Sequence, residues 1–120
     1  MRMATSEDDC LFCKIRDGKI PAQKVHEDDR ALAFRDIKPM APTHLVIVPR
    51  KHIATLNDLT VEDEALVGHL HLIARDLAAR EGFAAQGYRT LFNTNSHGGQ
   101  TVFHIHLHLL GGRHFAWPPG

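Results

Sequence analysis

The stretch of sequence that decides the fold lies near the C-terminal end and reads His104-Ile105-His106-Leu107-His108-Leu109-Leu110. In an extended strand successive side chains point to opposite faces, so the three histidines share one face and the apolar residues share the other. This period-2 alternation predicts a strand from Thr101 to Leu110. Building a sheet does not require histidine on the second face, so that face is a candidate for chemistry.

Length and composition limit what the chain can be. Its 120 residues are enough for one domain with a core, and the formal net charge of zero argues against a basic surface for nucleic acid. No apolar run approaches the roughly 20 residues of a membrane span, and Met1 to Asp9 lacks the apolar stretch of a signal peptide. We therefore expect one cytoplasmic domain over residues 1–120, with residues 1–9 as a disordered tail and with neither nucleic acid nor membrane as a partner.

The rest of the chain predicts a sheet and one long helix. Thr60 is a typical N-cap, and acidic residues follow at 62–64, where the helix dipole favours them. An apolar stripe then runs through Leu66, Leu70, Ile73 and Leu77, and Gly82 is placed to end the helix.

Shorter elements are expected at Leu11–Arg16 (helix), Lys24–His26, Ala31–Arg35, His44–Val48 and Tyr88–Asn93 (strands), and Thr94–Gln100 (loop). The sum is an α+β fold with one antiparallel sheet of about five strands, one long helix and a short N-terminal helix.

Three interpretations of the histidine face stay open on its residues alone. It is a solvated polar face, a metal site or a site of covalent catalysis at phosphorus. The Cα atoms of His104 and His108 lie roughly 13 Å apart in a strand, so at most two of the three histidines can share one metal ion. A neutral imidazole can attack phosphorus without first losing a proton, and a neighbouring histidine can supply a hydrogen bond or a proton.

The loop before the histidines favours the phosphate interpretation. Gly98-Gly99 permits the close backbone approach of an anion nest, and polar side chains surround it at Asn93, Ser96, Gln100 and Thr101. The two cysteines, Cys10 and Cys13, are better interpreted as a metal or redox pair than as a disulfide, because no export signal precedes them.

The segment Gly98–Arg113 closely resembles the signature of the histidine triad superfamily. Gly111-Gly112-Arg113 and the ending Trp117-Pro118-Pro119-Gly120 resemble its Hint branch of purine nucleoside phosphoramidases. The similarity extends back through residues 31–37 and 41–52 and covers nearly the whole chain from Cys10 onward.

The resemblance implies a hydrolase that cleaves the P–N bond of purine nucleoside 5′-phosphoramidates and releases the nucleoside monophosphate. His106 would become nucleotidylated, His108 would contact the phosphate, and Asp36 would bind the ribose hydroxyls. The other implied site residues are His104 and Thr101 in the catalytic group, Gln100, Asn93 and Gly99 at the phosphate, Ile37, Phe12, Ile15 and Phe34 around the base, and His44 beside the triad. The family is homodimeric, and Trp117 would lie near the partner's site.

Two features depart from the usual Hint pattern. Thr101 stands where serine is usual, which keeps the hydroxyl and adds a methyl group near the leaving group. The Cys-x-x-Cys pair is similar to that of zinc-bearing bacterial members, which implies a structural zinc site made of Cys10, Cys13, His52 and His104, with no metal needed for the chemistry.

Two alternatives remain beside the phosphoramidase. One is a dinucleoside polyphosphate hydrolase, against which Gly111-Gly112-Arg113 argues, and the other is a non-catalytic nucleotide-binding regulatory protein.

Overall fold

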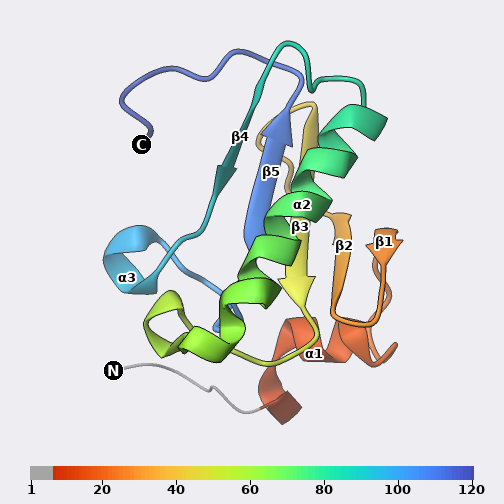
Figure 1. Ribbon diagram of the computed structural model, residues 1–120, viewed down its shortest axis with the longest axis vertical. Coiled ribbons are helices and arrows are strands. Elements are labelled where there is room, and N and C mark those ends of the chain that lie inside the picture. Colours follow the sequence, from red (N-terminus) through yellow and green to blue (C-terminus); the bar gives the residue numbers. More distant parts are fainter. Residues whose placement is uncertain (1–6) are drawn as a thin grey trace.

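One five-stranded antiparallel sheet organises the chain in the computed structural model, which describes residues 7–120 (Figure 1). Its spatial order is β1-β2-β3-β5-β4. The strands are β1 (Lys24–Glu27), β2 (Ala31–Arg35), β3 (Thr43–Pro49), β4 (Tyr88–Leu91) and β5 (Leu107–Gly111). With the long helix α2 (Glu64–Arg80) and the short helix α1 (Leu11–Arg16), this confirms the predicted α+β fold.

Each face of the sheet packs against a different helix, and β3 shows the division most clearly. Leu45 and Ile47 pack in one core with Leu70 and Leu77 of α2. Val46 and Val48, which alternate with them, pack in a second core with α1, whose contribution is Phe12, Cys13 and Ile15. Alternate residues of β3 therefore pack on opposite faces of the sheet, as expected for a strand that is buried on both faces.

The long helix begins and ends close to the predicted positions. Thr60 donates its backbone N–H to Asp63 Oδ2 at 3.0 Å, and this capping interaction opens a 3-10 turn, η3 (Val61–Asp63), that leads into α2. After Arg80 the chain turns at Gly82, whose φ of +90° is a conformation that favours glycine.

The histidine strand is shorter than predicted. β5 begins at Leu107, so His104 and His106 precede it instead of lying within it. The β3–β5 register runs to Ile47↔Leu107, and two positions further along it Ile105 would lie opposite Pro49, which has no N–H to donate. Ile105 instead donates its N–H to the carbonyl of Ile53 at 2.8 Å, and the ladder stops.

Three other boundaries differ from the sequence prediction. β4 ends at Leu91, and the expected loop contains a single helical turn, α3 (Asn95–Gly98). Within the expected disordered tail, Glu7–Asp9 forms a 3-10 turn, η1; residues 1–6 of that tail lie outside the described residues. Another 3-10 turn, η2 (Leu56–Asp58), follows β3. Within residues 7–120, no helix has both the length and the apolar character needed to span a bilayer.

Gly111, at the end of β5, provides a test of how tightly the α2 face is packed. A Cβ atom at this position would lie 2.4 Å from two ring carbons of Phe83, which is only 5% exposed. We expect Gly111→Ala to lower the free energy of unfolding by about 1–3 kcal/mol, because the rigid buried ring has little room to move. Urea unfolding monitored by circular dichroism measures this change.

The matched control is Gly68→Ala, on the exposed side of α2, where an added Cβ meets nothing within 4 Å. This variant should be about 0.5–1 kcal/mol more stable than the native chain, because alanine favours a helix interior over glycine. Equal stability of native protein and Gly111→Ala would show that Phe83 does not limit this position.

Candidate active site and metal centre

The three histidines of the motif divide between two clusters of potential ligands. Among residues 7–120, one group joins Cys10, Cys13, His52 and His104, and a second group joins Asp36, His44 and His108. His106 lies between His104 and His108 in the sequence, and the centroid of its ring is 4.9 Å from that of His108. The motif thus contributes side chains to two separate groups.

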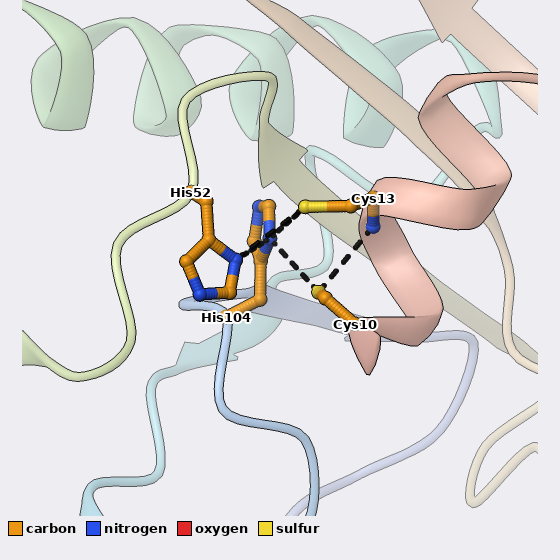
Figure 2. A group of neighbouring side chains, drawn as sticks. All are labelled: Cys10, Cys13, His52 and His104. Atoms are coloured by element: carbon orange, nitrogen blue, oxygen red, sulfur yellow. Dashed lines mark hydrogen bonds between the residues drawn. The ribbon is translucent and has the colours of Figure 1, made fainter. Parts of the chain in front are cut away.

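The first group draws its four side chains from three distant segments, and Figure 2 shows them pointing toward one another. Cys10 is the N-cap of α1 and Cys13 lies in its first turn, while His52 follows β3 and His104 precedes β5. His104 Nδ1 lies 3.3 Å from Cys10 Sγ and 3.5 Å from Cys13 Sγ. His52 Nδ1 lies 3.4 Å from Cys13 Sγ and 3.2 Å from His104 Nδ1.

These separations fit a tetrahedral metal ion. Metal–nitrogen bonds of about 2.0–2.1 Å and metal–sulfur bonds of about 2.3 Å place two nitrogens about 3.3 Å apart and a nitrogen about 3.6 Å from a sulfur. His104 Nε2 donates to the Pro49 carbonyl at 2.7 Å, which leaves the lone pair of Nδ1 facing the cluster. The four residues therefore lie close enough together to bind a metal.

Burial dominates the electrostatics of this group. Cys13 is 1% exposed and His104 is fully buried, and both cysteines are free thiols. Burial, followed by the hydrogen bond with Cys10, raises the pKa of the Cys13 thiol to about 12. A cation that binds here must therefore displace a proton.

His106 has the geometry of a nucleophile. Its Nδ1–H donates to the carbonyl of His104 at 2.8 Å, so the lone pair remains on Nε2. Burial lowers the pKa of His106, and the ring is therefore neutral near pH 7. Phe12 of α1 packs edge-on against this imidazole with a centroid separation of 4.9 Å, which fixes its plane.

The half-buried His108 is paired with the buried His44. His44 Nε2 lies 2.8 Å from His108 Nδ1, and the Met40 backbone N–H donates to His44 Nδ1 at 3.1 Å. Burial lowers the pKa of His108 to about 4, and the neighbouring His106 and His44 act in the same direction. The pKa of His44 is also lowered by burial, although the Asp36 carboxylate opposes this.

Asp36 lies at the edge of this histidine pair. One carboxylate oxygen, Oδ1, accepts the backbone N–H of Lys38 at 2.8 Å, and the other, Oδ2, is 3.5 Å from His44 Nε2. Asn93, which the sequence predicts at the phosphate, lines a cavity of about 290 Å³ together with Met40, His44, Arg89, His108, Arg113 and Phe115.

The apolar residues predicted around the base are not alike in exposure. Phe12, Ile15 and Phe34 are buried in the α1 core, and the rings of Phe12 and Phe34 are 5.5 Å apart. Ile37 is 93% exposed, and Trp117 in the C-terminal tail is 82% exposed. The three buried residues thus support the histidine face from below, whereas Ile37 is free to contact a ligand.

Internal hydrogen bonds hold the loop that is predicted to face the phosphate. The backbone N–H groups of Gly99 and Gln100 donate to Ser96 and Asn95 in the turn around α3, so they are not available to an anion. The Gln100 side chain is also committed: its Nε2 donates to the carbonyls of Ala54 and Val102, and its Oε1 accepts the N–H of Asn95. Gln100 therefore organises the loop, while Thr101 is exposed beside it.

Sequence reasoning missed the backbone groups that fix the histidines. The carbonyls of Pro49 and His104 and the N–H of Met40 each bond one imidazole nitrogen. Nearly all residues carry a backbone N–H and a carbonyl, so residue type alone does not indicate which of these groups bond a histidine. Arg113 donates to the Met40 carbonyl, and only its place in Gly111-Gly112-Arg113 hinted at a role.

Comparisons with known proteins agree with this architecture. A family model described as "Scavenger mRNA decapping enzyme C-term binding" matches residues 9–116. An uncharacterized HIT-like protein of Synechococcus elongatus is 53% identical over 94% of this chain and 98% of its own length. The purine nucleoside phosphoramidase of Escherichia coli is 49% identical over 88% of this chain and 89% of its own. The crystal structure of a HIT family hydrolase from Legionella pneumophila has a TM-score of 0.92 and 59% identity, over 93% of this chain and 100% of that one.

The lowered pKa of His108 makes stability depend on pH in a defined direction. The ordinary value is 6.5 and the folded value is about 4, so between these values the unfolded chain binds more protons than the folded one. This contribution to stability is complete above about pH 6.5 and is lost as the pH falls toward about 4.

His108→Gln removes this titration. The loss of unfolding free energy between about pH 7 and about pH 4 should be smaller in the variant by about 2 kcal/mol. Urea unfolding at a series of pH values measures the two slopes, and His114→Gln, at an exposed position, is the control. Parallel curves for native protein and His108→Gln would contradict the assignment of a neutral, half-buried imidazole at position 108.

Proposed function

The chain belongs to the histidine triad family, and we propose that it hydrolyses the phosphorus–nitrogen bond of purine nucleoside 5′-phosphoramidates. The observation that carries this proposal is His106, a buried neutral imidazole whose Nδ1–H is held by a carbonyl and whose Nε2 lone pair is therefore available. The 49% identity to the Escherichia coli purine nucleoside phosphoramidase supports the same reaction class.

The reaction takes place in two steps. His106 Nε2 attacks the α-phosphorus, a bond forms between Nε2 and phosphorus, and the P–N bond to the amine breaks as the amine takes up a proton. Water then attacks the nucleotidyl-histidine, the P–Nε2 bond breaks, and the nucleoside monophosphate leaves while a proton returns to solvent. The His104 carbonyl, which accepts the Nδ1–H at 2.8 Å, stabilises the positive charge that develops on the ring.

The nucleotide is bound on the same face. The Asp36 carboxylate suits the two ribose hydroxyls, because an ionised carboxylate accepts several hydrogen bonds. The exposed Ile37 side chain contacts the base, and Phe12, Ile15 and Phe34 form the apolar support beneath it. Asn93, Thr101 and the Gly99 segment lie at the phosphate end, with Gln100 holding their loop in shape.

We also assign a structural zinc ion to Cys10, Cys13, His52 and His104. Two sulfur and two nitrogen donors at tetrahedral separations favour zinc, and four protein ligands make a closed site. When bound, the ion ties α1 to the segments before β5 and after β3 and takes no part in bond breaking. It thereby orients His104, whose carbonyl holds the nucleophile.

The remaining proposals concern assembly and compartment. We propose a homodimer, in which the C-terminal tail with the exposed Trp117 lies near the partner's active site. β4 is an outer strand of the sheet, and an antiparallel partner strand suits such an edge. A reducing cytoplasm suits the two free thiols.

Replacement of the nucleophile tests the reaction. We expect His106→Ala to lose at least about 1000-fold in kcat for release of a fluorescent amine from its adenosine 5′-phosphoramidate, because no other group can form the covalent intermediate. Rapid quenching and mass spectrometry of native protein should detect an adenylylated peptide containing residue 106.

The control is His71→Ala, an exposed position on α2, which covers the opposite face of the sheet. Equal turnover by native protein and His106→Ala would remove His106 from the mechanism. Nucleotide binding without turnover would indicate the regulatory alternative, and faster cleavage of dinucleoside polyphosphates would indicate the other hydrolase class.

Elemental analysis tests the zinc site. Native protein should carry about one zinc per chain, Cys13→Ser should lose it, and removal of the metal by a chelator should lower the free energy of unfolding by more than about 2 kcal/mol. His108→Gln is the matched control, because His108 belongs to the other ligand group and its replacement should leave the zinc content unchanged. Native protein without zinc, or zinc lost on His108→Gln alone, would refute this assignment.

A further inference from the structure

Two arginines pack against the same C-terminal aromatic ring and line the same cavity as His44 and His108, but only Arg113 also donates to the Met40 carbonyl. The guanidinium carbons of Arg89 and Arg113 lie 5.3 Å and 4.2 Å from the ring centroid of Phe115. Arg89 donates to the carbonyl of Ala116 at 2.9 Å, and Arg113 donates to that of His114 at 3.1 Å. Arg113 also donates two hydrogen bonds to the Met40 carbonyl, from Nε at 3.2 Å and from Nη2 at 3.0 Å.

The Met40 peptide groups link Arg113 to His44. Met40 is 69% exposed, so backbone contacts hold it rather than packing. Its N–H donates to His44 Nδ1 at 3.1 Å. A backbone N–H can only donate, so His44 Nδ1 must be the unprotonated nitrogen and the ring proton must lie on Nε2.

The proton position on His44 also determines the tautomer of His108. His44 Nε2 lies 2.8 Å from His108 Nδ1, and since His44 Nε2 carries the proton, His108 Nδ1 is the acceptor. His108 is neutral and must then carry its own proton on Nε2. His106 has the opposite arrangement, with its proton on Nδ1 toward the His104 carbonyl. Two adjacent imidazoles thus offer the site one lone pair and one N–H.

We propose that Arg113 is a positioning residue that acts through the Met40 backbone and His44 to hold His108 in its Nε2–H tautomer, as a hydrogen-bond donor to the phosphate or the departing amine. The consequence for catalysis rests on the proposed function, whereas the tautomers do not. The same contacts argue against a metal ion at Asp36, His44 and His108. An ion on His44 Nε2 would require a proton on Nδ1, directly opposite the Met40 N–H.

Histidine-ring 15N NMR tests the proposal without any assay of activity. In native protein both His44 and His108, assigned from His44→Gln and His108→Gln spectra, should show the Nε2–H tautomer. Arg113→Ala should shift both rings toward a mixture of tautomers, because the Met40 N–H is no longer held in place. Arg89→Ala is the matched control: it also loses a Phe115 contact and a hydrogen bond to a tail carbonyl, and it lines the same cavity, yet the hydrogen bonds to the Met40 carbonyl come from Arg113 and remain.

Kinetics give a second readout. Arg113→Ala should lower kcat for the phosphoramidate about tenfold with KM within about twofold, because a donor to the reacting atoms is lost rather than substrate binding. Arg113→Lys, which retains one donor, should be intermediate in both measurements and carries the test if the alanine variant does not fold.

The proposal is overturned if native His108 carries its proton on Nδ1, or if Arg113→Ala leaves both tautomers unchanged. A rise in KM without a change of tautomer would instead make Arg113 a substrate contact and would also overturn it. Absence of turnover by native protein, with the tautomers responding as expected, would refute the proposed reaction and leave the role of Arg113 intact.

Discussion

The pairing of β3 with β5, and its termination at Pro49, is the constraint on which both sites depend. As long as the ladder continues, alternation keeps His108 over the sheet beside Val46. Where proline cannot donate, the chain leaves the ladder, and the segment containing His104 and His106 bonds to the carbonyls of Pro49 and Ile53 instead. One missing N–H thereby separates His104, in the Cys–His cluster, from the proposed nucleophile His106 two residues away.

The proton positions of the histidines are set by the backbone rather than by other ionisable side chains. A carbonyl receives the N–H of His104, another receives that of His106, and a backbone N–H faces His44. Peptide groups do not titrate, so these assignments hold over the whole pH range in which the rings stay neutral. Burial lowers the pKa of all four rings, and the combination gives each imidazole one defined donor and one defined acceptor.

The sequence was informative wherever periodicity or residue type decided the outcome. Alternation in β3 and in the histidine motif predicted a sheet with two different faces, and the stripe from Leu66 to Leu77 predicted the helix that covers one of them. The ligand group of Cys10 and His104 followed from the family resemblance, and the structure brings its four members together. The failures have a common cause. The extent of β5, the turn at α3 and the internal bonds of Gln100 all depend on which backbone group lies opposite, and sequence patterns do not record that.

The contact between Cys10 and His104 has a consequence for the synthesis of the chain. These residues are 94 positions apart, and Phe12, between the two cysteines, also packs against His106. Helix α1 thus completes its packing only after the segment before β5 has been synthesised, and closing so long a loop carries a substantial entropic cost. A chain that lacks the segment from residue 104 onward therefore leaves Cys10 and the ring of Phe12 without these partners at the same time.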